Sequence, residues 1–122
     1  MKNYLFVYGT LRSGHKNPVA VFFHQQAQLV GQATMPGRLF SLGEYTAAVY
    51  EPAATEWVHG EVFQLMDTPL VFNVLDEYEG IGEQFPQPNE YIRSLCEVVC
   101  EGKSLKCWVY LLNRSERSWS NI

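Results

Sequence analysis

One glutamate of this chain falls on the apolar side of a predicted helix. Apolar residues recur with helical spacing over residues 68–79, and successive residues of a helix lie ~100° apart around its axis. The apolar stripe comprises Val71, Val74, Leu75 and Tyr78. Glu79 falls between Leu75 and Phe72, inside the apolar arc. A carboxylate facing a core or cavity is costly to keep charged, so it must be paired, protonated or functional.

Two structural explanations for Glu79 compete with a function in proton transfer. A frayed last helical turn would release the side chain to solvent. An ion pair with Arg38 or Arg93 would neutralise it. Asp76 and Glu77 fall on the opposite side of the helix, where we expect a solvated surface.

The stretch Tyr8-Gly9-Thr10-Leu11 is the second candidate for chemistry. It ends a run of aromatic and branched residues, and Gly9 permits a sharp turn that a ligand can approach closely. The exposed N–H groups of such a turn can hold a carboxylate or an amide oxygen. Thr10 adds a hydroxyl, and Tyr8 a ring with a polar end. The alternative is an ordinary turn that ends a strand.

Composition excludes several other functions. A net charge of -4 argues against nucleic acid as the main partner. The apolar run Leu5–Val7 is too short for a signal peptide or a membrane span, so we expect a cytoplasmic protein that does not bind membranes. Cysteines 96, 100 and 107 and the three histidines show no metal-ligand spacing, so we expect no metal and interpret the cysteines as core residues.

The elements that must position these residues follow from periodicity and turn signals. We predict a strand over 4–8, a helix from Asn17-Pro18 to about Gln28, and a helix beginning at Thr68-Pro69. Several short strands are predicted over 29–65, with turns at MPGR and LGEY and the best strand candidates at TAAVYEP and WVHGEVFQL. A hairpin closes the pattern, with arms YIRSLCEVVC and SLKCWVYLL.

About six strands with hairpin-like connections and two separate helices indicate one α+β domain with a mainly antiparallel, barrel-like sheet. We place this domain at residues 1–112. The polar segment 113–122 is predicted to be a frayed tail.

In the order and spacing of its motifs, the chain resembles the γ-glutamylcyclotransferase-like family over roughly residues 4–112. The closer branch is that of γ-glutamylamine cyclotransferase and its small bacterial relatives. The motifs that carry the resemblance are YGTL at 8–11, PGRL at 36–39, Gly43 with Tyr45, GEVF at 60–63, LDEYEG at 75–80, Tyr91-x-Arg93 and WVY at 108–110. Thr46 stands where the family pattern has proline, and segment 81–90 is longer than in compact relatives. The identity of the substrate is therefore not carried over.

The resemblance implies a small mixed β-barrel with flanking helices and a cavity at one side. It also implies a reaction without a cofactor, in which the α-amine of a γ-glutamyl group attacks its own γ-carbonyl. The products are 5-oxoproline and a free amine or amino acid. The family's acid–base glutamate falls on Glu79.

Substrate contacts are then expected from Tyr8, Gly9, Thr10, Leu11 and Tyr110. The two tyrosines are expected as cavity walls and hydroxyl donors. Two other functions stay open, a non-catalytic small-molecule binder on the same barrel and an amide hydrolase that uses Glu79. The leaving amine, the oligomeric state and any lid movement of segment 81–90 are not given by the sequence.

Overall fold

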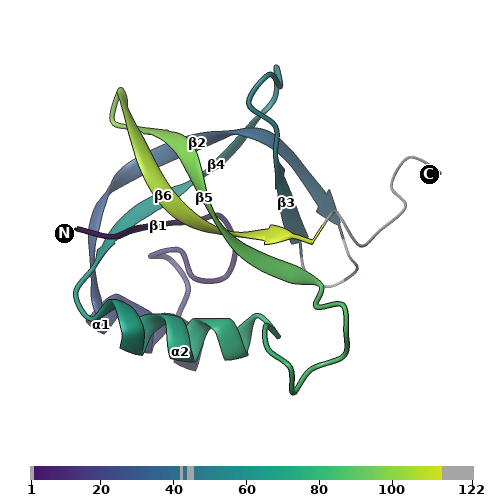
Figure 1. Ribbon diagram of the computed structural model, residues 1–122. Helices are drawn as coiled ribbons and strands as arrows, with labels where there is room; N and C mark the ends of the chain where they lie inside the picture. The colour runs from purple at the N-terminus through teal and green to yellow at the C-terminus, as the bar shows by residue number, and fades with distance from the viewer. Residues whose placement is uncertain (1, 42, 44–45, 114–122) are drawn as a thin grey trace.

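The computed structural model describes residues 2–41, 43 and 46–113 and forms a barrel with two helices beneath it (Figure 1). The helices within these residues are α1 (Pro18–Gln25) and α2 (Thr68–Tyr78). The strands are β1 (Tyr4–Val7), β2 (Ala27–Ser41), β3 (Thr46–Tyr50), β4 (Trp57–Leu65), β5 (Tyr91–Cys100) and β6 (Lys103–Leu112).

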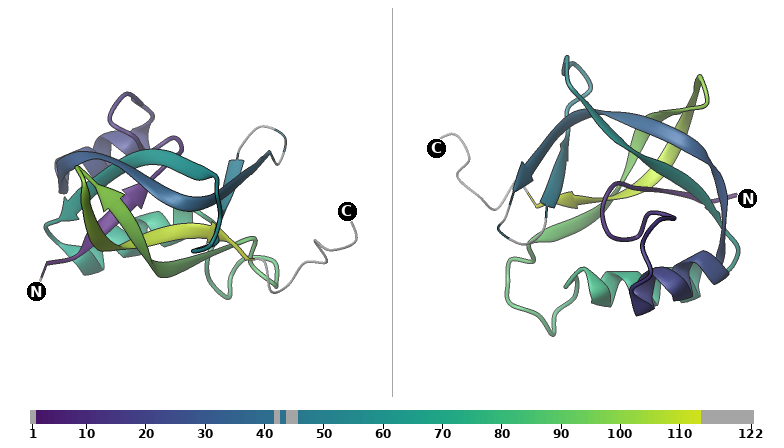
Figure 2. Two further views of the ribbon diagram at one scale, coloured as in Figure 1. Left: turned by 90° about the horizontal axis from the view of Figure 1, so that it is seen from above. Right: turned by 180° about the vertical axis from the view of Figure 1, so that it is seen from behind.

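Five of the strands form a closed barrel. Their order is β2-β4-β1-β6-β5, and pairing of β5 with β2 closes the ring, while β3 extends the sheet from the far end of β2 (Figure 2). The β1–β6 pair is parallel and the other pairs are antiparallel. The predicted fold class, a mixed and mainly antiparallel barrel with flanking helices, is confirmed.

Strand β2 is the main difference from the sequence prediction. Residues 27–41 form one long strand instead of several short ones, and the turn expected at Pro36-Gly37 is wrong. Pro36 pairs with Trp57 of β4, whereas Gly37 pairs with Tyr50 of β3. These residues therefore mark the place where β2 passes from one partner strand to the other. A side chain at Gly37 would lie 2.0 Å from the Val49 carbonyl oxygen, so the close approach of β3 requires glycine here.

Both helices begin with a polar cap and a proline. Asn17 Oδ1 accepts a hydrogen bond from the Ala20 N–H at 2.9 Å, as predicted. Helix α1 ends at Gln25, three residues before the predicted end, because β2 begins at Ala27. The cap of α2 is Asp67, one residue before the predicted Thr68.

Two apolar clusters hold the site in place. One fills the barrel and includes the three buried, free cysteines, as expected. The other lies between the outer face of β1 and β4 and the two helices, with Leu5, Phe23, Phe63 and Leu75 among its members. Because α2 is buried along Val71 and Leu75, its C-terminal end is fixed against the barrel.

Three sequence predictions lie partly outside the described residues. These are the LGEY turn, of which Gly43 is described, the Gly43–Tyr45 motif, and the polar tail, of which Asn113 is described. Within the described part of the chain, no helix is long and apolar enough to cross a membrane.

Candidate active site

The six residues predicted to contact or convert a substrate line one cavity. Its volume is about 860 Å³, and it lies between the end of β1, the end of α2 and the segment that leads into β5. The predicted residues on its wall are Tyr8, Gly9, Thr10, Leu11, Glu79 and Tyr110. The tertiary structure therefore brings the glutamate and the Gly9–Leu11 turn together, although they are far apart in the sequence.

Glu79 is the capping residue at the C-terminal end of α2. Its N–H donates to the Leu75 carbonyl at 2.9 Å, and the next two N–H groups, of Gly80 and Ile81, donate to Glu77 and Asp76. This is the Schellman arrangement, in which a glycine with positive φ ends the helix; Gly80 has φ +75. The helix end is closed by hydrogen bonds, so a frayed last turn does not explain Glu79.

The Glu79 carboxyl is partly buried and has no hydrogen bond or ion pair among the described residues. The ion pairs suggested from the sequence are wrong, because Arg38 binds Glu51 and Arg93 binds Asp76. Burial, and secondarily the negative charge of Asp76, raises the pKa of Glu79 from 4.5 to about 7. The carboxyl is therefore suited to gain and lose a proton near neutral pH.

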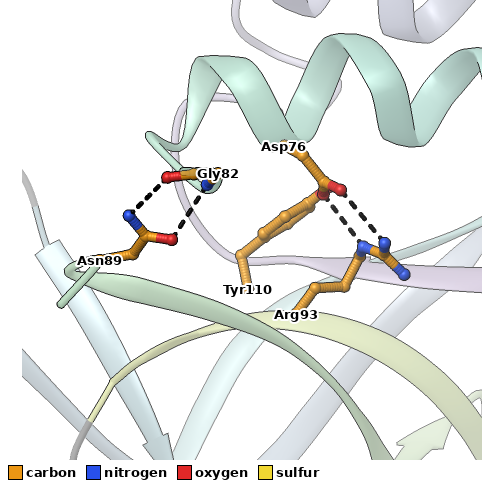
Figure 3. Close-up of polar contacts among 5 residues, drawn as sticks. All are labelled: Asp76, Gly82, Asn89, Arg93 and Tyr110. Atoms are coloured by element: carbon orange, nitrogen blue, oxygen red, sulfur yellow. Dashed lines mark hydrogen bonds and ion pairs between the residues drawn. The ribbon is translucent and has the colours of Figure 1, made fainter. Parts of the chain in front are cut away.

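Asp76 links α2 to the barrel instead of facing solvent as predicted (Figure 3). Arg93 of β5 donates to both carboxylate oxygens of Asp76, at 3.0 and 3.1 Å. The Tyr110 hydroxyl of β6 donates to the same carboxylate at 2.6 Å. The Arg93 guanidinium also lies 3.8 Å from the centre of the Phe72 ring. Glu77 is exposed, as predicted.

The turn that follows β1 presents main-chain donors to the cavity. Among the described residues, the N–H groups of Gly9, Thr10 and Leu11 donate to no protein acceptor, while the Arg12 N–H closes the turn onto the Gly9 carbonyl at 3.2 Å. Arg12 Nε donates to the same carbonyl at 3.1 Å, which places a positive charge beside the turn. These groups together could bind an anionic oxygen.

Two side chains anchor this turn. Buried Glu61 of β4 accepts from the Ser13 N–H and hydroxyl, at 2.6 and 2.7 Å. These hydrogen bonds help to hold the pKa of Glu61 below its usual value, against the opposing effect of burial. On the other side, the hydroxyls of Thr10 and Tyr78 are hydrogen bonded at 2.8 Å. The turn is thereby tied to the barrel and to the end of α2.

The two predicted tyrosines supply cavity walls, but each hydroxyl donates within the protein. The Tyr8 hydroxyl donates to the Tyr110 carbonyl oxygen and accepts from the Ala48 N–H at 3.1 Å. The Tyr110 hydroxyl donates to Asp76. The expectation that these hydroxyls donate to a substrate therefore does not fit this arrangement. Burial raises the pKa of both groups, so they stay protonated at neutral pH.

Several cavity residues were not predicted from the sequence. Arg12 and His15 follow the predicted turn, and their side chains carried no pattern of their own. Tyr78 was assigned to the apolar stripe of the helix, but it is 43% exposed and lines the cavity. Segment 81–90 also borders the cavity and contributes Phe85, Pro86, Pro88 and Glu90. The other two histidines do not line it; His24 is hydrogen bonded to the Leu11 carbonyl and His59 is exposed.

Comparisons with known proteins agree with this architecture. A model of the family described as "Gamma-glutamyl cyclotransferase, AIG2-like" matches residues 5–121. A Vibrio cholerae protein named "Putative gamma-glutamylcyclotransferase" is 33% identical over 100% of this chain and 92% of its own length. The "Gamma-L-glutamyl-butirosin B gamma-glutamyl cyclotransferase" of Niallia circulans is 31% identical over 92% of this chain and 68% of its own length.

A solved structure supports the same assignment. The crystal structure of an AIG2-like protein from Mus musculus superposes with a TM-score of 0.70 and 25% identity, over 92% of this chain and 78% of that one. The family match spans residues 5–121, the Vibrio cholerae protein is similar in sequence, and the mouse protein is similar in fold. This chain therefore belongs to the AIG2-like γ-glutamylcyclotransferase family.

Proposed function

We propose that this protein converts a γ-glutamyl amine or γ-glutamyl amino acid to 5-oxoproline and a free amine, with Glu79 as general acid and base. The observation that carries the proposal is the position of Glu79. Glu79, whose pKa is about 7, lines the same cavity as the N–H groups of residues 9–11, and in the described part of the chain neither the carboxyl nor these N–H groups have a hydrogen-bond partner. Membership in the family supports the reaction class.

The reaction needs a proton acceptor and then a proton donor. The α-amine of a γ-glutamyl group is mostly protonated at neutral pH, so a base must remove a proton before the nitrogen can attack the γ-carbonyl. One C–N bond forms and another breaks, and the protons lost by the attacking nitrogen equal those gained by the leaving nitrogen. Glu79, with a pKa near neutrality, can take a proton in the first step and return it in the last.

The Gly9–Leu11 turn could bind the negative charge that this reaction involves. Ring closure places negative charge on the former carbonyl oxygen, and preorganised N–H donors stabilise such an oxyanion. The Gly9–Leu11 amides and the adjacent Arg12 charge suit that oxygen or the substrate's α-carboxylate. Because the attack is intramolecular, the main task of the cavity is to hold the substrate bent for ring closure.

The test is to incubate the protein with a γ-glutamyl amine and a γ-glutamyl dipeptide and to identify the products by mass spectrometry. A cyclotransferase gives 5-oxoproline, an amide hydrolase gives glutamate, and a non-catalytic binder gives neither. We expect 5-oxoproline from at least one substrate.

The variant Glu79→Gln assigns the proton transfer. It keeps the size of the side chain but cannot exchange a proton, and general acid–base catalysis contributes ~10²–10⁴-fold. We expect a loss of kcat in that range, with substrate binding retained. Glu77→Gln, on the exposed face of the same helix, is the matched control and should keep full activity. Full activity of Glu79→Gln would exclude the mechanism.

A further inference from the structure

We propose that segment 81–90 forms a rigid apolar subsite that selects substrates with a bulky apolar leaving amine. The inference rests on the proposed function and adds the class of leaving group. It depends on three observations: the size of the cavity, the apolar character of the wall beside Glu79, and the hydrogen bonds that fix the segment.

The cavity is larger than the reacting group requires. Its volume of about 860 Å³ lies in the range of pockets that enclose drug-sized ligands. A γ-glutamyl group is much smaller than such a ligand. With the γ-carbonyl at Glu79 and the Gly9–Leu11 turn, most of the cavity is left for the group attached to the leaving nitrogen.

The wall contributed by the segment is mainly apolar. Three of its four lining residues are Phe85, Pro86 and Pro88, Phe85 being partly exposed and the two prolines exposed, and the fourth is Glu90, directly before β5. The Tyr78 ring lines it from the end of α2, with 43% of the residue exposed and its hydroxyl bound to Thr10. Binding is favoured when an apolar ligand covers apolar surface that is exposed to water in the free protein.

Side-chain hydrogen bonds within the segment hold this wall in place, and Figure 3 shows the two between Asn89 and Gly82. The Asn89 side chain accepts from the Gly82 N–H at 3.0 Å and donates to the Gly82 and Pro86 carbonyls at 3.1 and 3.2 Å. Gln87 Nε2 donates to the carbonyls of Gly82 and Phe85, at 2.8 and 3.0 Å. A wall that is already ordered loses little conformational entropy when it binds a ligand, so the contact area contributes more fully to affinity.

The experiment compares γ-glutamyl-phenethylamide with γ-glutamyl-ethylamide, two substrates that differ in the leaving group by one phenyl ring. We expect kcat/KM for the phenethylamide to be about 10-fold to 100-fold higher, the range that corresponds to burial of an aromatic side chain. A ratio near one, or a preference for the ethylamide, would overturn the inference while leaving the proposed function intact. Absence of 5-oxoproline from both amides would also overturn the inference. Its absence from the γ-glutamyl dipeptide as well would refute the proposed function.

Variants locate the preference in the segment. Phe85→Ala removes the ring but keeps the main-chain bonds at that residue, and we expect it to lower the phenethyl-to-ethyl ratio toward one. Phe85→Leu keeps the position filled and should give an intermediate ratio even if the alanine variant folds poorly. Leu95→Ala, at an exposed apolar residue of β5 outside the cavity, is the control and should leave the ratio unchanged. A wild-type ratio in both Phe85 variants would contradict the assignment.

Discussion

Replacement of Glu79 by glutamine should stabilise the folded protein at alkaline pH. The Glu79 carboxyl has a pKa of about 7 in the folded protein against an ordinary value of 4.5. The stability that such a group contributes is fully present below pH 4.5 and is lost as pH rises through 7, because the folded state then holds an ionised, partly buried carboxylate. Glutamine has the same shape and carries no charge.

The magnitude follows from the two pKa values. Their difference, about 2.5, converts at about 1.36 kcal/mol per pKa unit to about 3 kcal/mol. We therefore expect the free energy of unfolding of Glu79→Gln, relative to wild type, to rise by about 3 kcal/mol between about pH 4 and about pH 8.5. Wild type and variant would be compared at each pH, so the contributions of other titrating groups cancel.

The assay is urea unfolding followed by tryptophan fluorescence, with the slope m checked for equality between the proteins. Glu77→Gln on the same helix is exposed and should show no such pH-dependent difference. A stability difference between Glu79→Gln and wild type that is the same at both pH values would refute the reasoning, because it would mean that the Glu79 pKa is not raised.

Three further predictions concern residues that support the site. Gly80→Ala should lower the free energy of unfolding by about 1 kcal/mol, because φ is +75 at this position and a residue with a Cβ is strained there. An added Cβ would contact no neighbouring atom at either Gly80 or Gly14, so Gly14→Ala is the control and should have little effect in the same urea assay. Tyr8→Phe should cost about 1–3 kcal/mol in thermal or urea unfolding, because a buried N–H and a buried carbonyl lose their hydroxyl partner. In the proposed reaction, kcat/KM should decrease as the pH is lowered through about 7, because Glu79 becomes protonated and can no longer act as a base. Asp76→Asn removes a negative charge that, together with burial, raises the Glu79 pKa, so this decrease should occur at lower pH in the variant. An unchanged pH dependence of kcat/KM would contradict that electrostatic effect.

The local features of the site could be predicted from the sequence because each depends on residues close together in the chain. Helical periodicity over residues 68–79 predicted the helix that α2 forms and placed Glu79 among apolar residues at its end. The Asn17-Pro18 start of α1 and the hairpin of β5 and β6 follow from equally local patterns. The resemblance to a known family assigned the glutamate its chemistry.

Only the tertiary structure decided which groups meet. Asp76 was expected in solvent, because helical periodicity cannot show that a strand carrying Arg93 crosses that face of the helix. The turn expected at Pro36-Gly37 is instead the point where one long strand exchanges its partners, because pairing between distant segments overrode a local turn signal. The raised pKa of Glu79 also depends on packing, since burial and the nearby carboxylate arise only when α2 lies against the closed barrel.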